Sequence, residues 1–231
     1  MPLNLLCAGA AKGLVTARRE KFAAATGADI EAAFGAVGAM REKLLAGAPC
    51  DAIVLTAALI DDLAASGFVL PGTSAALGRV RTGIAVRAGE SPPDISNAVA
   101  LRAALQGATG IYFPDPARAT AGIHFAGVLK RLGIDAEVAT RLKTFLNGAA
   151  AMSALAQSGA AGEIGCTQIT EIRYTPGVSL VGRLPPEFEL VTTYTAAVCV
   201  NARQPDLARR LVDLLAGPAS HDLRLQGGFE D

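Results

Sequence analysis

Short apolar segments and segments of helical periodicity alternate along most of the chain. Apolar runs bounded by glycine, proline and polar residues predict buried strands, whereas apolar residues spaced three and four apart predict amphipathic helices. Strands are expected at 3–7, 29–34, 52–55, 80–86, 110–113, 163–167 and 189–200. Helices are expected at 14–25, 39–45, 57–65, 98–106, 121–132, 149–157, 207–216 and 223–226, with a helical turn and a strand within 136–145. This alternation predicts an α/β fold with mainly parallel sheets flanked by helices.

Polar residues with short side chains stand where several of these helices should begin. Thr56 and Thr120 are expected to be N-caps, as is either Asp94 or Ser96, because hydroxyl and carboxylate oxygens accept hydrogen bonds from the first free N–H groups of a helix. The residues expected to end helices are Gly27, Gly47, Gly67, Gly133 and Gly159.

The segment 110–125 shows the pattern around which the chain is organised. An apolar strand ends at Pro114 and Pro116, and a helix then opens on the small residues Ala121 and Gly122. A helix start carries free N–H donors and a partial positive charge, so it favours anions. The same order of strand, small residues and helix start recurs at 8–12, 35–39 and 147–150. The repetition predicts one anion held by several backbone amides.

Two strand-rich runs, 79–86 and 189–200, flank the middle of the chain and are bounded by breakers. A two-lobed protein needs such segments if the chain crosses between its lobes twice. We therefore expect one lobe at 1–83 plus 193–231 and the other at 84–192, with crossings near 82–86 and 190–194.

Composition narrows the classes of function. Lys plus Arg equals Asp plus Glu at 21 each, and the basic residues form no stripe, so no nucleic acid partner is expected. No apolar run approaches the roughly 18 residues of a spanning helix, so membrane insertion is not expected either. The chain opens with Met1-Pro2-Leu3-Asn4, without a basic or apolar leader, which predicts a cytoplasmic protein. The alternative is a periplasmic protein whose signal peptide was trimmed.

Other chemistries fit the sequence poorly. The stretch 9–13 lacks the spacing and the hydroxyl residue of a P-loop, and no nucleophile elbow accompanies either histidine. No cluster has metal-ligand spacing, so no metal and no cofactor is expected. The four cysteines, Cys7, Cys50, Cys166 and Cys199, are far apart and are expected to be free buried thiols, although their spacing does not exclude a disulfide.

Several motifs together resemble those of molybdate-type solute-binding proteins. The segment 34–51 contains the Gly47-Ala48-Pro49-Cys50-Asp51 signature after its helix, and Asp115-Pro116 with 120–123 continues the match. Residues 162–172 belong to the same match. Residues 176–185 are typical of a branch of extracellular solute-binding proteins that resembles aconitate isomerase. The resemblance implies a two-lobed, periplasmic-binding-protein-like type II fold that binds its ligand in the cleft between lobes.

The oxyanion ligands of this family transfer only in part. The two serine positions fall at Ala10 and near Val37 or Gly38, and the tyrosine position falls at Gln168, so hydroxyl donors for molybdate are missing. Backbone amides with an amide side chain suit a planar di- or tricarboxylate instead. The expected ligand-binding residues are Ala10, Ala11, Lys12, Gly38, Ala39, Arg118, Thr120, Ala121, Gly122, Asn147 and Gln168.

Two functions of different class remain open. The chain binds a small organic anion as a solute-binding protein, with an ABC permease as partner only if a leader was removed. Alternatively, the chain is a cofactor-free isomerase that shifts a C=C bond in an unsaturated carboxylic acid, as the resemblance to aconitate isomerase implies. The second function needs a base, and His124 is the first candidate and Lys12 the second; Asp115 and Glu171 are the other titratable residues near the helix openings.

Overall fold

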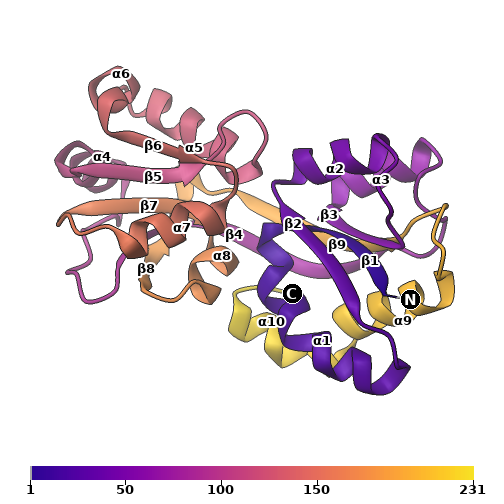
Figure 1. Ribbon diagram of the computed structural model, residues 1–231. Coiled ribbons are helices and arrows are strands. Elements are labelled where there is room, and N and C mark those ends of the chain that lie inside the picture. The colour runs from indigo at the N-terminus through magenta and orange to yellow at the C-terminus, as the bar shows by residue number, and fades with distance from the viewer. Residues whose placement is uncertain (1) are drawn as a thin grey trace. The chain divides into compact units, whose positions relative to one another are not determined.

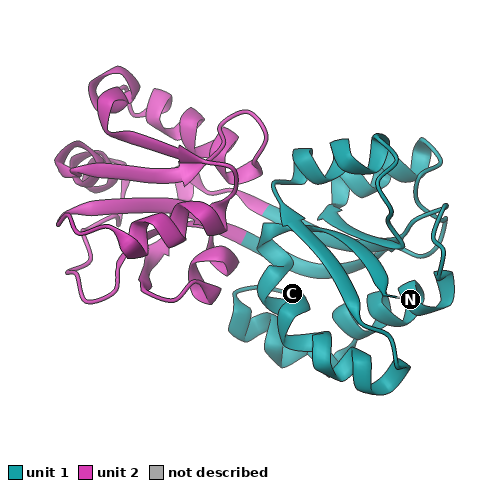
Figure 2. Ribbon diagram, in the orientation of Figure 1, with its two compact units in different colours: residues 1–80, 192–231 teal, residues 81–191 magenta. Residues whose placement is uncertain are grey.

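A computed structural model describes residues 2–231 of the chain (Figure 1). It divides into two compact units, residues 1–80 with 192–231 and residues 81–191, which we call unit 1 and unit 2 (Figure 2). The chain passes between them twice, after Val80 and before Thr192. The sequence-based lobe boundaries lie three residues later and one residue later, respectively.

Unit 1 contains both chain ends (Figure 2). Its elements are β1 (Leu3–Ala8), the 3-10 turn η1 (Gly9–Ala11), α1 (Lys12–Thr26), β2 (Ile30–Gly35), α2 (Val37–Leu45), β3 (Ala52–Thr56), α3 (Ala57–Ala65), the first part of β4 (Ala75–Arg87), nearly all of β9 (Val191–Val198), α9 (Pro205–Ala216), the 3-10 turn η4 (Pro218–Ser220) and α10 (His221–Gly227).

The sheet of unit 1 runs in the order β2-β1-β3-β9-β4. β1 pairs in parallel with β2 and β3, whereas β3 and β9 are antiparallel. Helices α2 and α3 cover one face, and α1, α9 and α10 cover the other (Figure 1). Helix α9 shows why, because Ala208, Leu211, Val212 and Leu215 follow a helical spacing and are all buried. Since β1, β2 and β3 are parallel, α1, α2 and α3 all begin at one edge of the sheet.

Unit 2 follows the same plan with its own core. Its elements are the second part of β4, α4 (Ala98–Gly107), β5 (Gly110–Pro114), α5 (Thr120–Arg131), α6 (Asp135–Val138), the 3-10 turn η2 (Ala139–Arg141), β6 (Leu142–Phe145), α7 (Gly148–Gln157), β7 (Glu163–Gln168), α8 (Ile169–Tyr174), β8 (Val178–Arg183) and the 3-10 turn η3 (Pro186–Phe188).

The sheet of unit 2 has the order β6-β5-β7-β4, with β8 also paired to β4. β5 is parallel to β6 and β7, and β4 is antiparallel to β7 and β8. One face packs under α4, α5 and α6, and the other packs under α7 and α8 (Figure 1). Alternate residues of β7 separate these faces: Ile164 and Cys166 belong to the α5 side, whereas Gly165 faces Met152 and Leu155 of α7.

The alternation of strands and helices is confirmed, with several corrections. The sheets are mixed, because β4 and β9 enter them antiparallel where the sequence pattern predicted mainly parallel sheets. Helix α8 and strand β8 were not predicted, because Pro176 and Gly177 suggested a loop region. Asn97, rather than Asp94 or Ser96, caps α4 by accepting from the N–H groups of Val99 and Ala100.

Two further capping predictions need correction, one in the position of the residue and the other in its hydrogen bond. Thr120 is the first residue of α5, and the N-cap position belongs to Ala119. Thr56 does stand at the N-cap of α3, but its side chain makes no capping hydrogen bond. Both helices therefore begin with no side-chain acceptor on their first N–H groups, unlike the ordinary capped start.

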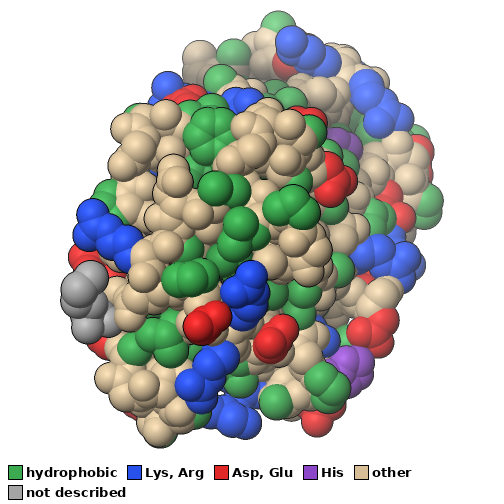
Figure 3. Space-filling view, turned by 90° about the vertical axis from the view of Figure 1, so that its right-hand side faces the viewer, with side chains coloured by type: hydrophobic (Ala, Val, Ile, Leu, Met, Phe, Trp, Pro, Cys, Tyr) green, Lys and Arg blue, Asp and Glu red, His purple; other side chains and the backbone are tan. Residues whose placement is uncertain are grey.

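Helix length and the distribution of surface charge describe the outside of the molecule. Within residues 2–231 no helix combines the length and the apolar character needed to cross a bilayer. On the face shown in Figure 3, basic and acidic side chains are interspersed, in keeping with the balance of 21 basic and 21 acidic residues.

Candidate functional site

Three helices of unit 2 begin at the same edge of its sheet. β5, β6 and β7 are parallel, so their carboxyl ends coincide, and α5, α7 and α8 follow them. The first N–H groups of a helix have no partner within the helix and attract negative charge. Helix α8 has only six residues, so the edge offers the starts of two longer helices, α5 and α7. Different groups of the protein lie at these two helix starts.

The α7 opening is filled by side chains of the protein itself. Asn147 caps the helix, its Oδ1 accepting from the Ala150 N–H at 2.9 Å. The carboxylate of Glu171 accepts from the backbone N–H groups of Gly148 and Ala149 and from the hydroxyl of Thr167, at 2.6 Å. Asn147 thus reaches the predicted opening, but its side-chain oxygen is engaged in capping.

Glu171 also fixes the start of α8. It lies three residues beyond the N-cap residue Gln168 and accepts from its backbone N–H, which is the arrangement of a capping box. The carboxylate is buried, and this desolvation raises its pKa to about 7, although the hydrogen bonds from Thr167, Ala149, Gln168 and Gly148 act in the opposite direction. Glu171 is therefore a buried group that changes charge near neutral pH.

Gly148 is the reason that the carboxylate fits there. A Cβ at this position would lie 2.0 Å from both Glu171 Oε2 and Thr167 Oγ1. Any side chain at position 148 would therefore displace the Glu171 carboxylate, and the Thr167 hydroxyl that donates to it, from the helix start. The glycine in the Asn147-Gly148-Ala149-Ala150 segment makes room for an internal carboxylate rather than for a larger residue of the helix.

The α5 opening has no such internal occupant among the described residues. Its N-cap is Ala119, and no side chain makes a capping hydrogen bond there. Gly122 lets the first turn press against the end of β5, because a Cβ would lie 2.3 Å from the carbonyl oxygens of Pro114 and Asp115. Ala121 and Gly122 are buried, and Thr120 is half-buried.

An unpartnered amide lies on the sheet face that α5 covers. Gln168 is the last residue of β7, is 2% exposed, and neither its Oε1 nor its Nε2 has a hydrogen-bond partner within residues 2–231. It alternates onto the same face as Ile164 and Cys166, which pack with Phe125 of α5. Because β5 and β7 end together and α5 starts just beyond β5, Gln168 lies at the level of the α5 opening.

Thr82 adds a second unpartnered group beside Gln168. The two residues are direct partners across β4 and β7, and Thr82 Oγ1 is buried without a hydrogen bond in the described chain. An unmatched buried polar group costs about 1–3 kcal/mol. The α5 opening, the Gln168 amide and the Thr82 hydroxyl together form what we call the α5 site. Such a set of groups is suited to a ligand that both accepts and donates hydrogen bonds.

Unit 1 provides the remaining predicted residues. Ala10 and Ala11 are buried in η1, and Lys12 opens α1 with its ammonium 5.8 Å from the centre of the Phe34 ring. Gly38 and Ala39 are half-buried in the first turn of α2. Neither α1 nor α2 has a side-chain cap, so the predicted small-residue openings exist here as well.

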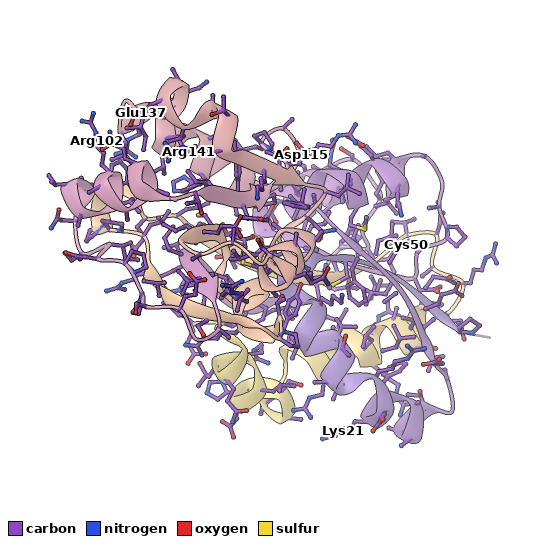
Figure 4. The ribbon with its side chains drawn as sticks, turned by 60° about the vertical axis from the view of Figure 1, so that its left-hand side comes forward. Lys21, Cys50, Arg102, Asp115, Glu137 and Arg141 are labelled. Atoms are coloured by element: carbon purple, nitrogen blue, oxygen red, sulfur yellow. The ribbon has the colours of Figure 1, made fainter. Side chains whose placement is uncertain are left out.

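The proposed base His124 makes a structural contact. Its Nε2 lies 2.7 Å from the carbonyl oxygen of Phe188, and because a carbonyl only accepts, this nitrogen carries the proton. Asp115, labelled in Figure 4, follows β5 and accepts from the Ala117 N–H at 2.7 Å. Arg118 is exposed in the same loop. The structure thus places His124 and Arg118 in unit 2, and Lys12 in unit 1.

Sequence reasoning missed the groups that distinguish the two openings of unit 2. Glu171 was a minor candidate, and Thr82 and Thr167 were not considered, although all three are buried. One signal was available: Glu171 stands three residues after the last strand residue, at the spacing of a capping box. The prediction of no metal stays a prediction; no group of potential metal ligands was found within residues 2–231.

Comparison with known proteins gives the class of this chain. Residues 3–230 match the family described as bacterial extracellular solute-binding protein, and the chain belongs to that family. It is also similar to an aconitate isomerase from a Pseudomonas species, with 28% identity over 220 residues that cover 93% of this chain and 82% of the relative.

Solved structures agree on the fold. The periplasmic molybdate-binding protein of Azotobacter vinelandii superposes with a TM-score of 0.82 at 19% identity, covering 99% of both chains. The sulfate-binding protein SubI of Mycobacterium tuberculosis H37Rv superposes with a TM-score of 0.76 at 18% identity, covering 99% of this chain and 86% of its own. The chain has the two-lobed α/β fold of periplasmic binding proteins, as the resemblance in its sequence implied.

Proposed function

We propose that this protein binds a small organic anion with two or three carboxylates, and that the α5 site holds one of them. The observation that carries the proposal is the Gln168 amide, which is buried and unpartnered beside an uncapped helix start. Membership of the solute-binding family supports a small-molecule ligand in general.

The chemistry of the α5 site favours a carboxylic acid over a tetrahedral oxyanion. A planar carboxylate accepts from the backbone N–H groups of α5 and from Gln168 Nε2, while Gln168 Oε1 requires a donor such as a ligand hydroxyl or a protonated carboxyl. A desolvated dianion such as molybdate offers only acceptors, so that it would leave the amide oxygen unmatched. In unit 1, Ala10 likewise supplies no hydroxyl.

Calorimetry with a panel of anions tests this proposal. We expect heat of binding from at least one di- or tricarboxylate, and a loss of at least 10-fold in affinity in Gln168→Leu, which removes two hydrogen-bonding atoms. Gln157→Ala, on the exposed end of α7, is the matched control and should bind as the wild type does. Binding of molybdate or sulfate with no response to any carboxylate would refute the proposal.

The second candidate function is isomerisation of an unsaturated carboxylic acid, with similarity to aconitate isomerase as its specific support. In this reaction a base removes a proton from the carbon next to a C=C bond, the electrons shift by one position, and the proton returns at the far end. Donors that grip carboxylates would also stabilise the negative charge after proton loss. His124 and Lys12 remain the proposed bases, and Glu171 joins them because its pKa of about 7 suits proton transfer.

Solvent exchange separates the candidates. The wild type should incorporate deuterium from D2O into cis- or trans-aconitate, and the variants His124→Ala, Lys12→Ala and Glu171→Gln should show which base is required. No exchange by the wild type would rule out aconitate as the substrate. Exchange that persists in all three variants would rule out these bases and leave the reaction standing.

The cytoplasmic location expected from the sequence stays a prediction. Fractionation of cells that express the native gene would test it, and recovery in the periplasm would contradict it. Only in that compartment would an ABC permease be a natural partner, so the same experiment decides whether a transport assay is worth doing.

A further inference from the structure

Two of the four cysteines meet in unit 1, although 149 positions separate them. The Sγ atoms of Cys50 and Cys199 lie 3.4 Å apart, with the Cys199 thiol donating to Cys50. The antiparallel pairing of β3 with β9 places them there, since Ala52 is opposite Val198 and the Cys199 N–H donates to the Asp51 carbonyl at 3.0 Å. The pairing of these two strands therefore brings the two cysteine residues next to each other.

The pair also borders a cavity that reaches the surface. A pocket of about 260 Å³ is lined by both cysteines, by the loop after α2 and by residues that follow β9. Gly47, Pro49 and Asn201 on its wall are exposed, and Arg203 adds a cation there. Cys50, labelled in Figure 4, is 8% exposed, whereas Cys199 is 1% exposed. A small reagent in this cavity would meet Cys50 first.

We propose that Cys50 and Cys199 form a redox-active dithiol that is oxidised to a disulfide by low-molecular-weight disulfides entering this cavity. The Sγ atoms need to approach by only about 1.4 Å to reach bonding distance. Cys7 and Cys166 are buried in β1 and β7, belong to different units, and do not line this cavity.

The exchange proceeds in two balanced steps. Cys50 loses its proton to solvent, and its thiolate attacks one sulfur of the reagent RSSR, forming a mixed disulfide and releasing one RS⁻. Cys199 then attacks the Cys50 sulfur, forming the internal disulfide, and its proton passes to the departing RS⁻, which leaves as the second thiol. The two cysteines are oxidised by two electrons, and RSSR is reduced to two thiols. The Cys50 contact raises the pKa of Cys199, as do burial and the nearby Asp51, which is consistent with Cys199 acting second.

Thiol counting after incubation of the full chain with oxidised glutathione tests the order of events. The wild type should fall from four alkylatable thiols to two after denaturation, with the peptides of Cys50 and Cys199 joined in the tryptic digest. Cys199→Ser should retain a glutathione on Cys50, because the second attack is missing, and Cys50→Ser should remain unmodified. Cys166→Ala, the matched control, should still form the internal disulfide.

Thermal stability is a second readout, and it can be measured on the wild type alone. The oxidised wild type should unfold about 5–10 °C above its reduced form, because the disulfide closes a very long loop. Four free thiols after oxidation, or a disulfide that includes Cys7 or Cys166, would overturn the proposal.

Discussion

The α5 and α7 openings of unit 2 stand at the same sheet edge and differ in what occupies them. The α7 opening contains Asn147 and the carboxylate of Glu171, so its donors are satisfied from within the chain. The α5 opening has an alanine as N-cap, and the unmatched amide of Gln168 ends the neighbouring strand at the same sheet edge. A helix start is therefore not a ligand site by virtue of its polarity. It becomes a candidate only where the protein leaves its donors and neighbouring polar atoms unpaired.

The largest expected effect is on the filled opening. Gly148→Ala would force its Cβ against Glu171 and Thr167, and we expect a loss of about 3–5 kcal/mol in the free energy of unfolding, since overpacking is combined with displacement of a buried carboxylate. Urea unfolding measures this loss. Gly159→Ala is the control, because a Cβ there meets nothing within 4 Å and should change stability by less than about 0.5 kcal/mol. Equal effects would refute the account of Gly148.

The charge of Glu171 gives the next effect. Its pKa is raised from 4.5 to about 7 by burial, so the folded state binds a proton that the unfolded state has released between these values. The stabilisation is complete below pH 4.5 and is lost as pH rises through 7, by about 3 kcal/mol in all. Glu171→Gln should lose this pH dependence when unfolding is compared at pH 5 and pH 8. A parallel decline in both proteins would contradict the shifted pKa.

At the α5 site, by contrast, a substitution should raise the stability of the protein. Gln168→Leu replaces an unmatched buried amide by an apolar side chain of similar size, and we expect an increase of about 1–2 kcal/mol in stability together with weaker anion binding. Denaturant unfolding and calorimetry on the same preparation would show both. A variant that is less stable and binds normally would mean that the amide serves the fold, and the distinction between the openings would fail.

The smallest effect compares a polar residue at the start of each helix, the N-cap Asn147 of α7 and the first residue Thr120 of α5. Asn147→Ala removes a capping acceptor and should cost about 1 kcal/mol, whereas Thr120→Ala removes no cap and should stay within about 0.5 kcal/mol. Thermal unfolding of both variants beside the wild type is sufficient. A larger loss at Thr120 than at Asn147 would show that the α5 start is capped after all.

The sequence specified the fold better than the site, for a physical reason. Hydrophobic periodicity reports local burial, so strands such as β1 and β7 and helices such as α1 could be placed to within about two residues. Caps were predicted less well because several neighbouring polar residues could serve as the N-cap of α4. Asp94 accepts from the Ser96 N–H at 2.9 Å, and Asn97 is the residue that caps the helix.

The contents of the site depend on contacts that no local pattern contains. Glu171 meets Gly148 only because β6 and β7 flank β5, and Cys50 meets Cys199 only because β9 returns beside β3. Likewise, nothing local distinguishes the unmatched Gln168 from an ordinary surface glutamine. Such pairings follow from the order of strands in a sheet, which the sequence pattern left open.

The position of Glu171 also means that a side chain of the protein competes with free anions for the N–H groups at the start of α7. A carboxylate attached to the chain is present at an effective concentration far above that of any free metabolite, so it prevents free anions from binding at the start of α7. Shortening residue 171 to alanine would expose these N–H groups and leave room for a free formate or acetate ion. Glu171 therefore limits the number of ligand carboxylates that the helix starts of unit 2 can bind.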